Sequence, residues 1–257
     1  MSRALPWLVG VAVVAVLAAG GYYLFTHREP PPLPPAALAP AQAPAPTGPR
    51  NPIAEAPTEK PLPALNESDP SVRDAFVALI GAQAVERYLN TEGAIRRIVA
   101  TVDNLPREEY SQRLDPVRPM QGVPRTTGQG DTLALAPENA ARYAPFIDLA
   151  TKVDTAKLVE TYRRHYPLFQ QAYVELGYPN GYFNDRLVET LDDLLAAPDP
   201  PARIGLATPH VLYEYADPAL EGLSAGQKVM IRIGAANAAR VKAKLRELRA
   251  EVASAPR

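Results

Sequence analysis

Residues 158–176 read LVETYRRHYPLFQQAYVEL, and this stretch decides the fold. Its large apolar side chains recur at steps of four, four, three, four and three residues, the period of a helix with one buried face. The stripe consists of Leu158, Tyr162, Tyr166, Phe169, Tyr173 and Leu176. Asp154 is the predicted N-cap, and Gly177 is the predicted C-cap. Because Pro167 has no amide hydrogen to donate, we expect a kink or a short break there.

Apolar residues recur at the same period on both sides of this stretch. Helices are predicted over 69–80, 83–89 and 93–105, then from near residue 137, and again from 184 onwards. Asp69 is the predicted N-cap of the first helix, and Asn184 is the predicted N-cap of the sixth, which follows the 158–176 stretch. Ser224 and Gln227 have the spacing of a capping box, which predicts a last helix whose apolar stripe continues to Val252. The sequence therefore predicts an all-α soluble domain.

Two segments depart from the helical period. Val211, Tyr213 and Tyr215 alternate with smaller or polar residues, which predicts a strand, and 204–207 is the nearby candidate partner for a short β-hairpin. Prolines and glycines interrupt every period between residues 106 and 135. A loop of roughly 30 residues is uncommon in a compact domain and is typical of functional or disordered segments.

The N-terminal run Leu5–Phe25 carries no charge and contains 21 residues. That length is enough to span about 30 Å of hydrocarbon as a helix. Trp7 lies near one end and Tyr22 and Tyr23 lie at the other, as expected for rings in the headgroup zones. We therefore predict a transmembrane anchor over residues 1–28, with the lipid bilayer as its partner.

A cleaved signal peptide is the alternative interpretation of this run, since residues 18–20 are small enough for a cleavage site. The run is longer than the usual signal core of about 7–15 residues, which favours the anchor. Arg3 precedes the run, and the positive-inside rule then predicts a cytoplasmic N-terminus. In a bacterium, the protein would be a single-pass protein of the inner membrane with its soluble domain in the periplasm.

A proline-rich segment follows the anchor. Thirteen of the 29 prolines lie between Pro30 and Pro63. Proline fixes φ and removes amide donors, so we predict a disordered, extended linker over 29–66. A PxxP spacing at Pro32 and Pro35 also fits a Pro-rich docking ligand. The predicted globular domain then covers 67–252, and 253–257 is a predicted disordered tail.

Composition and motifs narrow the classes of function. The chain has 27 Lys and Arg against 28 Asp and Glu, which argues against a dedicated nucleic-acid binder. It has no cysteine and three histidines, and no HExxH, Walker or GxSxG motif is present. We therefore predict no metal site and no cofactor, and the absence of a catalytic motif argues against an enzyme.

Tyrosines crowd the last part of the chain. Those on the helical stripe are expected to pack in the core. Those beside turns, with their polar neighbours, form a candidate binding surface together with the 106–135 loop. Its predicted members are Tyr178, Asn180, Tyr182, Asn184, Asp185, Arg186, Tyr213, Tyr215 and Asp217.

Several longer strings carry a family resemblance. They are TVDNLPR (101–107), RYAPF (142–146), YPLFQQAYVELGYPNGYFNDRLVETLDDLL (166–195) and VLYEYADPALEGLSAGQKVMIRIGAANAARVKAKLRELR (211–249). Over about residues 65–250 the chain resembles a family of bacterial membrane-anchored proteins, domain of unknown function 3014. The resemblance implies a bacterial setting, an N-terminal anchor, a Pro-rich linker and one conserved domain. It implies no activity, cofactor or catalytic residue.

Two functional hypotheses follow from the sequence. The first is a binding or scaffolding module that is tethered to the inner membrane and recognises an envelope protein or a cell-wall component. The alternative is a hydrolase of envelope polymers that uses Asp103, His165 or Asp185 as acid–base residues. A hydrolase would need two such groups within reach of one substrate position.

Overall fold

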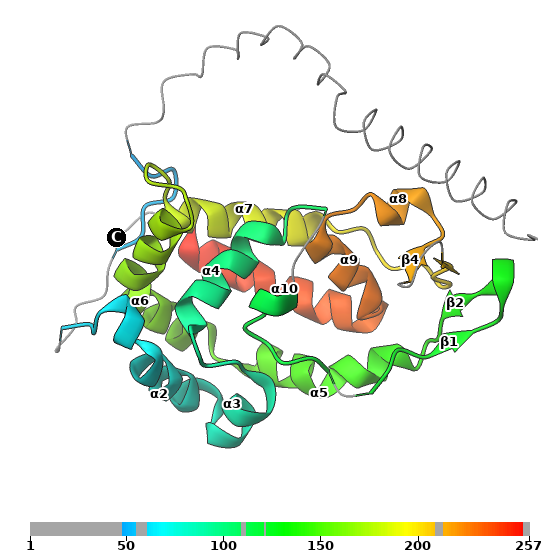
Figure 1. The fold of residues 1–257 in the computed structure, drawn as a ribbon, viewed down its shortest axis with the longest axis horizontal. Helices are drawn as coiled ribbons and strands as arrows, with labels where there is room; N and C mark the ends of the chain where they lie inside the picture. Colours follow the sequence, from blue (N-terminus) through cyan, green and yellow to red (C-terminus); the bar gives the residue numbers. More distant parts are fainter. Residues whose placement is uncertain (1–47, 55–60, 109–111, 121, 209–212, 254–257) are drawn as a thin grey trace, which may run out of the picture. The chain divides into compact units, whose positions relative to one another are not determined.

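The computed structural model describes residues 48–54, 61–108, 112–120, 122–208 and 213–253, and within them the chain is mainly helical (Figure 1). The longer helices are α2 (Asp69–Ile80), α4 (Ala94–Asn104), α5 (Asn139–Lys152), α6 (Thr155–Glu175), α7 (Phe183–Ala196) and α10 (Ala235–Val252). The shorter ones are α3 (Ala82–Tyr88), α8 (Pro218–Glu221) and α9 (Ala225–Arg232), with 3₁₀ turns η1 (Leu65–Glu67), η2 (Gln112–Leu114) and η3 (Gly130–Thr132). The prediction of a mainly helical domain is confirmed.

Helix α10 is the element around which the C-terminal half packs. It contacts α7 on one side and α5 on the other, and it also touches α6 (Figure 1). Helix α4 packs against α6 and α7, and the α2–α3 pair packs against α4 and α6 mainly through α2. Four interiors result in the described residues: the first around α4, α6 and α7, the second around α5, α9 and α10, and the third between α6, α7 and α10. The fourth lies around Leu206, Tyr215 and Ile231.

The stripe on α6 forms the centre of the first interior. Tyr166, Phe169 and Tyr173 are buried, and they pack against α4 and against Phe183 at the start of α7. The rings of Phe169 and Phe183 stack at 5.5 Å between centroids. The interpretation of the helical tyrosines as core residues is confirmed. The last member of the stripe, Leu176, is 42% exposed, because the helix ends there.

The predictions of where these helices begin and end are confirmed at some positions and wrong at others. Asp154 Oδ1 accepts a hydrogen bond from the amide of Lys157, so the predicted cap of α6 is confirmed. Helix α6 continues through Pro167 as one helix, so the expected break is wrong. Ser68 occupies the N-cap position of α2, and Asp69 instead accepts the amides of Gly93 and Ala94, at 2.8 and 3.2 Å. Asp69 therefore caps α4, which follows it by 25 residues.

The predicted last helix is two helices, α9 and α10. Gly234 separates them with φ at +83°, a left-handed value that a side chain would strain. Ser224 Oγ accepts from the amide of Gln227 at 3.1 Å, as predicted for the cap. The other half of the capping box is wrong, because Gln227 Nε2 donates to the backbone and side chain of Asp193 on α7. The side chain thereby ties α9 to α7.

Two short hairpins accompany the helices. Strand β3 (Leu206–Ala207) pairs antiparallel with β4 (Glu214–Tyr215), which confirms the predicted hairpin; residues 209–212 lie outside the described residues. Strand β1 (Thr126–Thr127) pairs with β2 (Ala134–Leu135) inside the segment that was predicted as a loop. A bridge between Ala134 and Gly205 joins the two hairpins.

A buried asparagine fastens the β1–β2 segment to α5. Asn139 is 1% exposed, and its Nδ2 donates to the carbonyls of Arg125 and Ala136 at 2.6 and 2.7 Å. Its Oδ1 accepts from the amide of Arg125 at 2.9 Å. The side chain therefore supplies the acceptor of the Arg125 amide and a second donor to two carbonyls that also accept backbone amides.

Replacing Asn139 with alanine is expected to lower the free energy of unfolding by about 2 kcal/mol, because three hydrogen bonds of a buried side chain are lost and the amide of Arg125 loses its acceptor. Urea denaturation followed by circular dichroism measures this change. The exposed Asn180 provides the matched control, since Asn180→Ala should change stability by less than about 0.5 kcal/mol. Equal effects of the two substitutions would contradict the structural role of Asn139.

Asp115 gives the same long segment a dependence on pH. Burial raises the pKa of its carboxyl group to about 6 from 3.8, and the charge of Arg97 acts in the opposite direction. A raised pKa in the folded state contributes stability that is present below the unfolded pKa and lost as the pH rises through the folded pKa. Ionised Asp115 should therefore destabilise the fold above about pH 6.

Asp115→Asn is expected to stabilise the protein at about pH 8, and the gain should shrink towards zero near pH 4. The side chain is partly exposed, so solvent screening limits the gain to about 1 kcal/mol. Urea denaturation of both proteins at several pH values tests this expectation. A difference that is constant with pH would refute it.

The predicted anchor Leu5–Phe25, with Trp7, Tyr22 and Tyr23, lies outside the described residues, as does the predicted linker up to residue 47. Among the helices that the structure describes, none has both the length and the apolar character needed to cross a bilayer. The predicted domain boundaries stay predictions. Residues near the end of the predicted linker do contact the helical domain, since Ile53 and Leu62 pack against its first interior.

Candidate functional site

The residues of the predicted binding surface fall into two groups at opposite ends of α7 (Figure 1). The first group lies in and after the turn between α6 and α7, and the second surrounds β4 beside α8. Asn180, Tyr213 and Asp217 are exposed; Tyr178, Tyr182 and Arg186 are half-buried; Asn184, Asp185 and Tyr215 are buried. Partner binding by this set stays a prediction.

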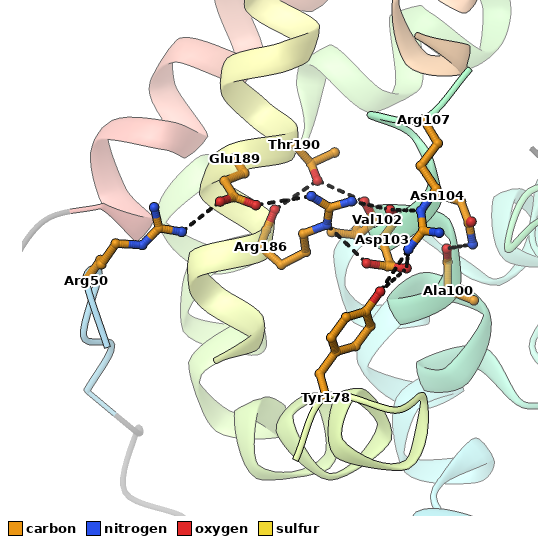
Figure 2. A network of polar contacts seen from close by, with 10 residues as sticks. All are labelled: Arg50, Ala100, Val102, Asp103, Asn104, Arg107, Tyr178, Arg186, Glu189 and Thr190. Carbon is orange, nitrogen blue, oxygen red and sulfur yellow. Dashed lines mark hydrogen bonds and ion pairs between the residues drawn. The ribbon is translucent and has the colours of Figure 1, made fainter. Parts of the chain in front are cut away.

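The first group meets α4 at a buried carboxylate, Asp103, which is 4% exposed (Figure 2). Arg107 Nη2 donates to Asp103 Oδ2 at 2.6 Å, and Arg186 Nε donates to Oδ1 at 3.1 Å. The hydroxyl of Tyr178 also donates to Oδ2, at 3.2 Å, and it accepts from Arg107 at 2.8 Å. We call Asp103, Arg107, Tyr178, Arg186 and Glu189 the ionic cluster.

The ionic cluster extends along α7 towards the N-terminal segment. Arg186 Nη2 donates to the carbonyl of Asp103 at 2.5 Å, while its Nη1 donates to Glu189 at 3.1 Å. Glu189 also accepts from Arg50 at 2.7 Å (Figure 2). The guanidinium of Arg186 therefore joins the end of α4 to the surface of α7, and Glu189 joins α7 to residue 50.

The charges of the ionic cluster reinforce one another. The charge of Asp103 raises the pKa of Arg107, although burial of the guanidinium acts against it. Burial acts to raise the pKa of Glu189, but the hydrogen bonds and charges of Arg50 and Arg186 outweigh it and hold that pKa below its ordinary value. Both shifts favour the charged forms of Arg107 and Glu189, so these two side chains contribute opposite charges to an electrostatic clamp between α4 and α7.

A second set of contacts binds residues 50 and 51 to the start of α7. The amide of Arg50 donates to Asp185 Oδ2 at 3.0 Å, and the amide of Asn51 donates to Oδ1 at 2.7 Å. Asn184 Nδ2 donates to the carbonyls of Asn51 and Val252, both at 2.9 Å. The N-cap of α7 is Tyr182, so the prediction that Asn184 caps this helix is wrong. Its amide instead joins both ends of the domain.

Asp185→Ala is expected to release residues 50 and 51 from α7. Their amides should then exchange hydrogen with solvent at least about ten-fold faster, because each loses its acceptor. Hydrogen–deuterium exchange with mass spectrometry measures this difference. Asp192→Ala is the matched control, since it removes a carboxylate of the same helix whose ion pair is with Arg249. Unchanged exchange in Asp185→Ala would show that other contacts hold the segment.

The three acid–base candidates of the hydrolase hypothesis lie in separate environments. Asp103 is bound by the ionic cluster, and Asp185 is bound by the amides of residues 50 and 51. His165 is 5% exposed, and its Nδ1 donates to the carbonyl of Thr161 at 2.9 Å. Within the described ranges, no hydrogen bond joins any two of the three, and they share no partner. No group of three or more His, Asp or Glu side chains there is placed to hold a metal ion.

An apolar cavity of about 280 Å³ lies beside the ionic cluster, among α2, α4, α6, α7 and α10. Its walls are mainly aliphatic and aromatic, and they include Ile95, Val159 and Phe183. His165 is also one of the lining residues, and its Nε2 lies 3.5 Å from Ser71 Oγ. The cavity therefore offers a binding volume for hydrocarbon and no charged side chain.

Sequence reasoning missed the partners of Asp103 and the whole cavity. Arg107 lies four residues from Asp103, and Glu189 lies three residues from Arg186, so the spacing of local ion pairs could have indicated both contacts. Arg50 carries no local signal, because its contact is set by the packing of the N-terminal segment on α7. The residues lining the cavity have the same periodicity as residues that fill a core. A void among them becomes visible only when the five helices are placed.

The fold and its contacts define a helical domain with a structural ionic clamp and an apolar cavity. Residues 94–249 match the model of the family described as "Protein of unknown function (DUF3014)". The match covers more than half of the chain, and the chain belongs to this family. No curated protein and no solved structure matches it significantly. The family resemblance seen in the sequence is thereby confirmed, while membrane anchoring stays a prediction.

Proposed function

We propose that this protein is a binding module of the bacterial envelope, tethered to the inner membrane by Leu5–Phe25. The predicted span and the Pro-rich linker support the tether. The soluble domain would face the periplasm, where it would meet an envelope protein or a cell-wall component.

One observation carries the proposal: the end of the linker is fastened to the domain. Asp185 accepts two backbone amides from residues 50 and 51, and Asn184 donates to the carbonyl of residue 51. A flexible spacer needs no such contacts to join two independent parts. Because residues 50 and 51 are docked, the tether joins the domain at a fixed place on its surface. Such an attachment suits a binding module that must hold a defined orientation relative to the tether.

The hydrolase alternative has no comparable support. Its three candidate residues are each engaged with separate groups, and two of them hold the fold together. Catalysis would need a pair of acid–base groups within reach of one substrate atom. Binding therefore agrees better with the arrangement than catalysis.

A reporter that is active only in the periplasm, fused to the C-terminus of the full chain, tests the topology. We expect periplasmic activity in the membrane fraction. A photoreactive amino acid at Asn180 or Tyr213, both exposed, should then trap a discrete partner in cells, whereas the same residue at the exposed Ala239 on α10 should not. A chain whose residues 1–28 are replaced by a cleaved signal peptide should lose most of this adduct. A cytoplasmic reporter signal, or adducts that do not depend on the anchor, would refute the proposal.

A further inference from the structure

We propose that the apolar cavity binds one unbranched aliphatic chain, supplied as a fatty acid. This inference rests on the proposed function for the source of the chain, the membrane to which the domain is tethered. Its physical basis is independent of that function and lies in the size, the lining and the position of the cavity.

The size of the cavity calls for an occupant. Native interiors are packed as densely as organic crystals, and voids larger than a water molecule are few. The cavity, of about 280 Å³, is partly open to solvent, so without an occupant its apolar walls would stay in contact with water and lack the dispersion contacts of a packed interior. A hydrophobic ligand restores those contacts. The cavity is therefore better explained as a site that is filled in the cell than as a packing defect.

The lining selects the chemistry of the occupant. No Asp, Glu, Lys or Arg side chain lines the cavity. The polar side chains on the wall are engaged within the protein: the Tyr162 hydroxyl donates to Asn184 at 3.1 Å, and Thr161 Oγ1 donates to the carbonyl of Lys157 at 2.8 Å. His165 Nδ1 is bound by the carbonyl of Thr161. A sugar or a nucleotide would lose its hydration without gaining partners, so a hydrocarbon fits best.

The volume fixes the number of carbon atoms. An apolar cavity of about 150 Å³ accommodates benzene, so a volume near twice that size holds roughly a dozen carbons. The cavity is thus large enough for one chain of medium length and too small for two. A fatty acid meets this limit, whereas a phospholipid would have to leave its second chain outside.

The position of the cavity links it to the tether. Leu187 of α7 and Leu248 and Val252 of α10 line it, and α7 also holds residues 50 and 51 of the linker. Asn184 bonds to the carbonyls of both Asn51 and Val252. The chain that leads to the predicted anchor therefore leaves the domain beside the cavity. This arrangement would keep the cavity near the bilayer, which is the natural store of aliphatic chains.

Helix α2 offers a matched pair of positions for the test. Ala75 lines the cavity, while Ala78, one turn further along the same helix, is exposed. Ala75→Trp should fill the volume, and Ala75→Leu should fill it in part with less risk to folding. Ala78→Trp adds the same bulk to the same helix outside the cavity. Circular dichroism and thermal unfolding establish that each variant is folded.

The full chain, purified in lipid nanodiscs, is irradiated with a dodecanoic acid that carries a diazirine, and adducts are mapped by mass spectrometry. We expect adducts on α4, α6 and α7, removed by excess dodecanoate. Ala75→Trp should reduce them at least about ten-fold and Ala75→Leu partly, while Ala78→Trp leaves them unchanged. Dodecanoate should also raise the melting temperature of the wild-type protein and of Ala78→Trp, but not that of Ala75→Trp.

Three results would overturn the inference: adducts confined to residues 5–25, equal labelling of Ala75→Trp and Ala78→Trp, or labelling of the cavity by a diazirine-bearing phospholipid but not by the fatty acid. Because labelling uses purified protein, its failure leaves the tethered binding module standing. Failure of the topology and anchor-dependence experiments, with cavity labelling intact, would instead refute the module and its membrane source while keeping the ligand class.

Discussion

Replacing Asp103 with alanine is expected to lower the free energy of unfolding by about 3–5 kcal/mol. The substitution removes the shared acceptor of Arg107, Arg186 and Tyr178. The side chain of Arg186 is only 19% exposed, so its charge would remain largely buried with Glu189 as its remaining ionic partner. Urea denaturation of the wild-type and variant proteins measures the loss.

Two further variants separate the charge from the packing at this position. Asp103→Leu combined with Arg186→Met removes both charges and leaves apolar groups of similar length, so it should recover part of the stability lost in Asp103→Ala. Asp192→Ala breaks the exposed pair with Arg249 and should have a much smaller effect. A loss below about 1 kcal/mol in Asp103→Ala would show that the ionic cluster does not clamp α4 to α7.

The ionic cluster also separates what the sequence can predict from what it cannot. Helix α6 and its cap at Asp154 could be predicted, because the apolar stripe and the bond from Asp154 to Lys157 involve neighbours three or four residues apart. Asp103 and Asp185 were identified as candidate acids. Asp103 has one partner four residues away, Arg107, but its pair with Arg186 and the bond of Asp185 to Asn51 span 83 and 134 residues of the chain. No periodicity in the sequence indicates such distant pairs. Asp103 and Asp185 were therefore proposed as acid–base residues, whereas the structure gives both a structural role.

The wrong predictions of helix ends also arise from contacts between residues that are far apart in the chain. Asp69 and Gln227 have the residue types of local caps, and both side chains bond to another helix instead. Each can satisfy a distant backbone or side-chain group as readily as a local amide, and tertiary packing decides between them. Gly234 lies inside the single helix that was predicted from Ser224 to Val252, whereas its positive φ ends one helix and begins the next.

The cavity shows a limit of a different kind. Ile95, Phe183 and Val252 each lie on an apolar stripe, and each is buried, so residue-level reasoning assigns them correctly to the interior. Five helices turn apolar faces towards the cavity. Whether their side chains fill the space between them depends on small shifts of the helices, of about the size of one methyl group. Side-chain type alone therefore predicts which residues are buried, but it does not predict the cavity among them.

Phe183→Ala is expected to lower the free energy of unfolding by about 3–5 kcal/mol. Phe183 is 1% exposed and stacks on Phe169, with the Tyr173 ring 5.8 Å away. It also lines the apolar cavity, so the substitution would enlarge an existing void rather than create a separate one. The walls of a larger cavity lose more contacts, which places the expected loss in the upper part of the range.

Phe183→Leu is the matched control, since it keeps an apolar side chain and should lose less than about 1.5 kcal/mol. Urea denaturation without and with dodecanoate distinguishes packing from ligand binding. A ligand that binds only the folded protein raises its apparent stability by mass action, so dodecanoate should return part of the loss in Phe183→Ala. If Phe183→Ala unfolds no more easily than Phe183→Leu, then Phe183 does not hold α6 and α7 together, and the apolar wall must be supported by other residues.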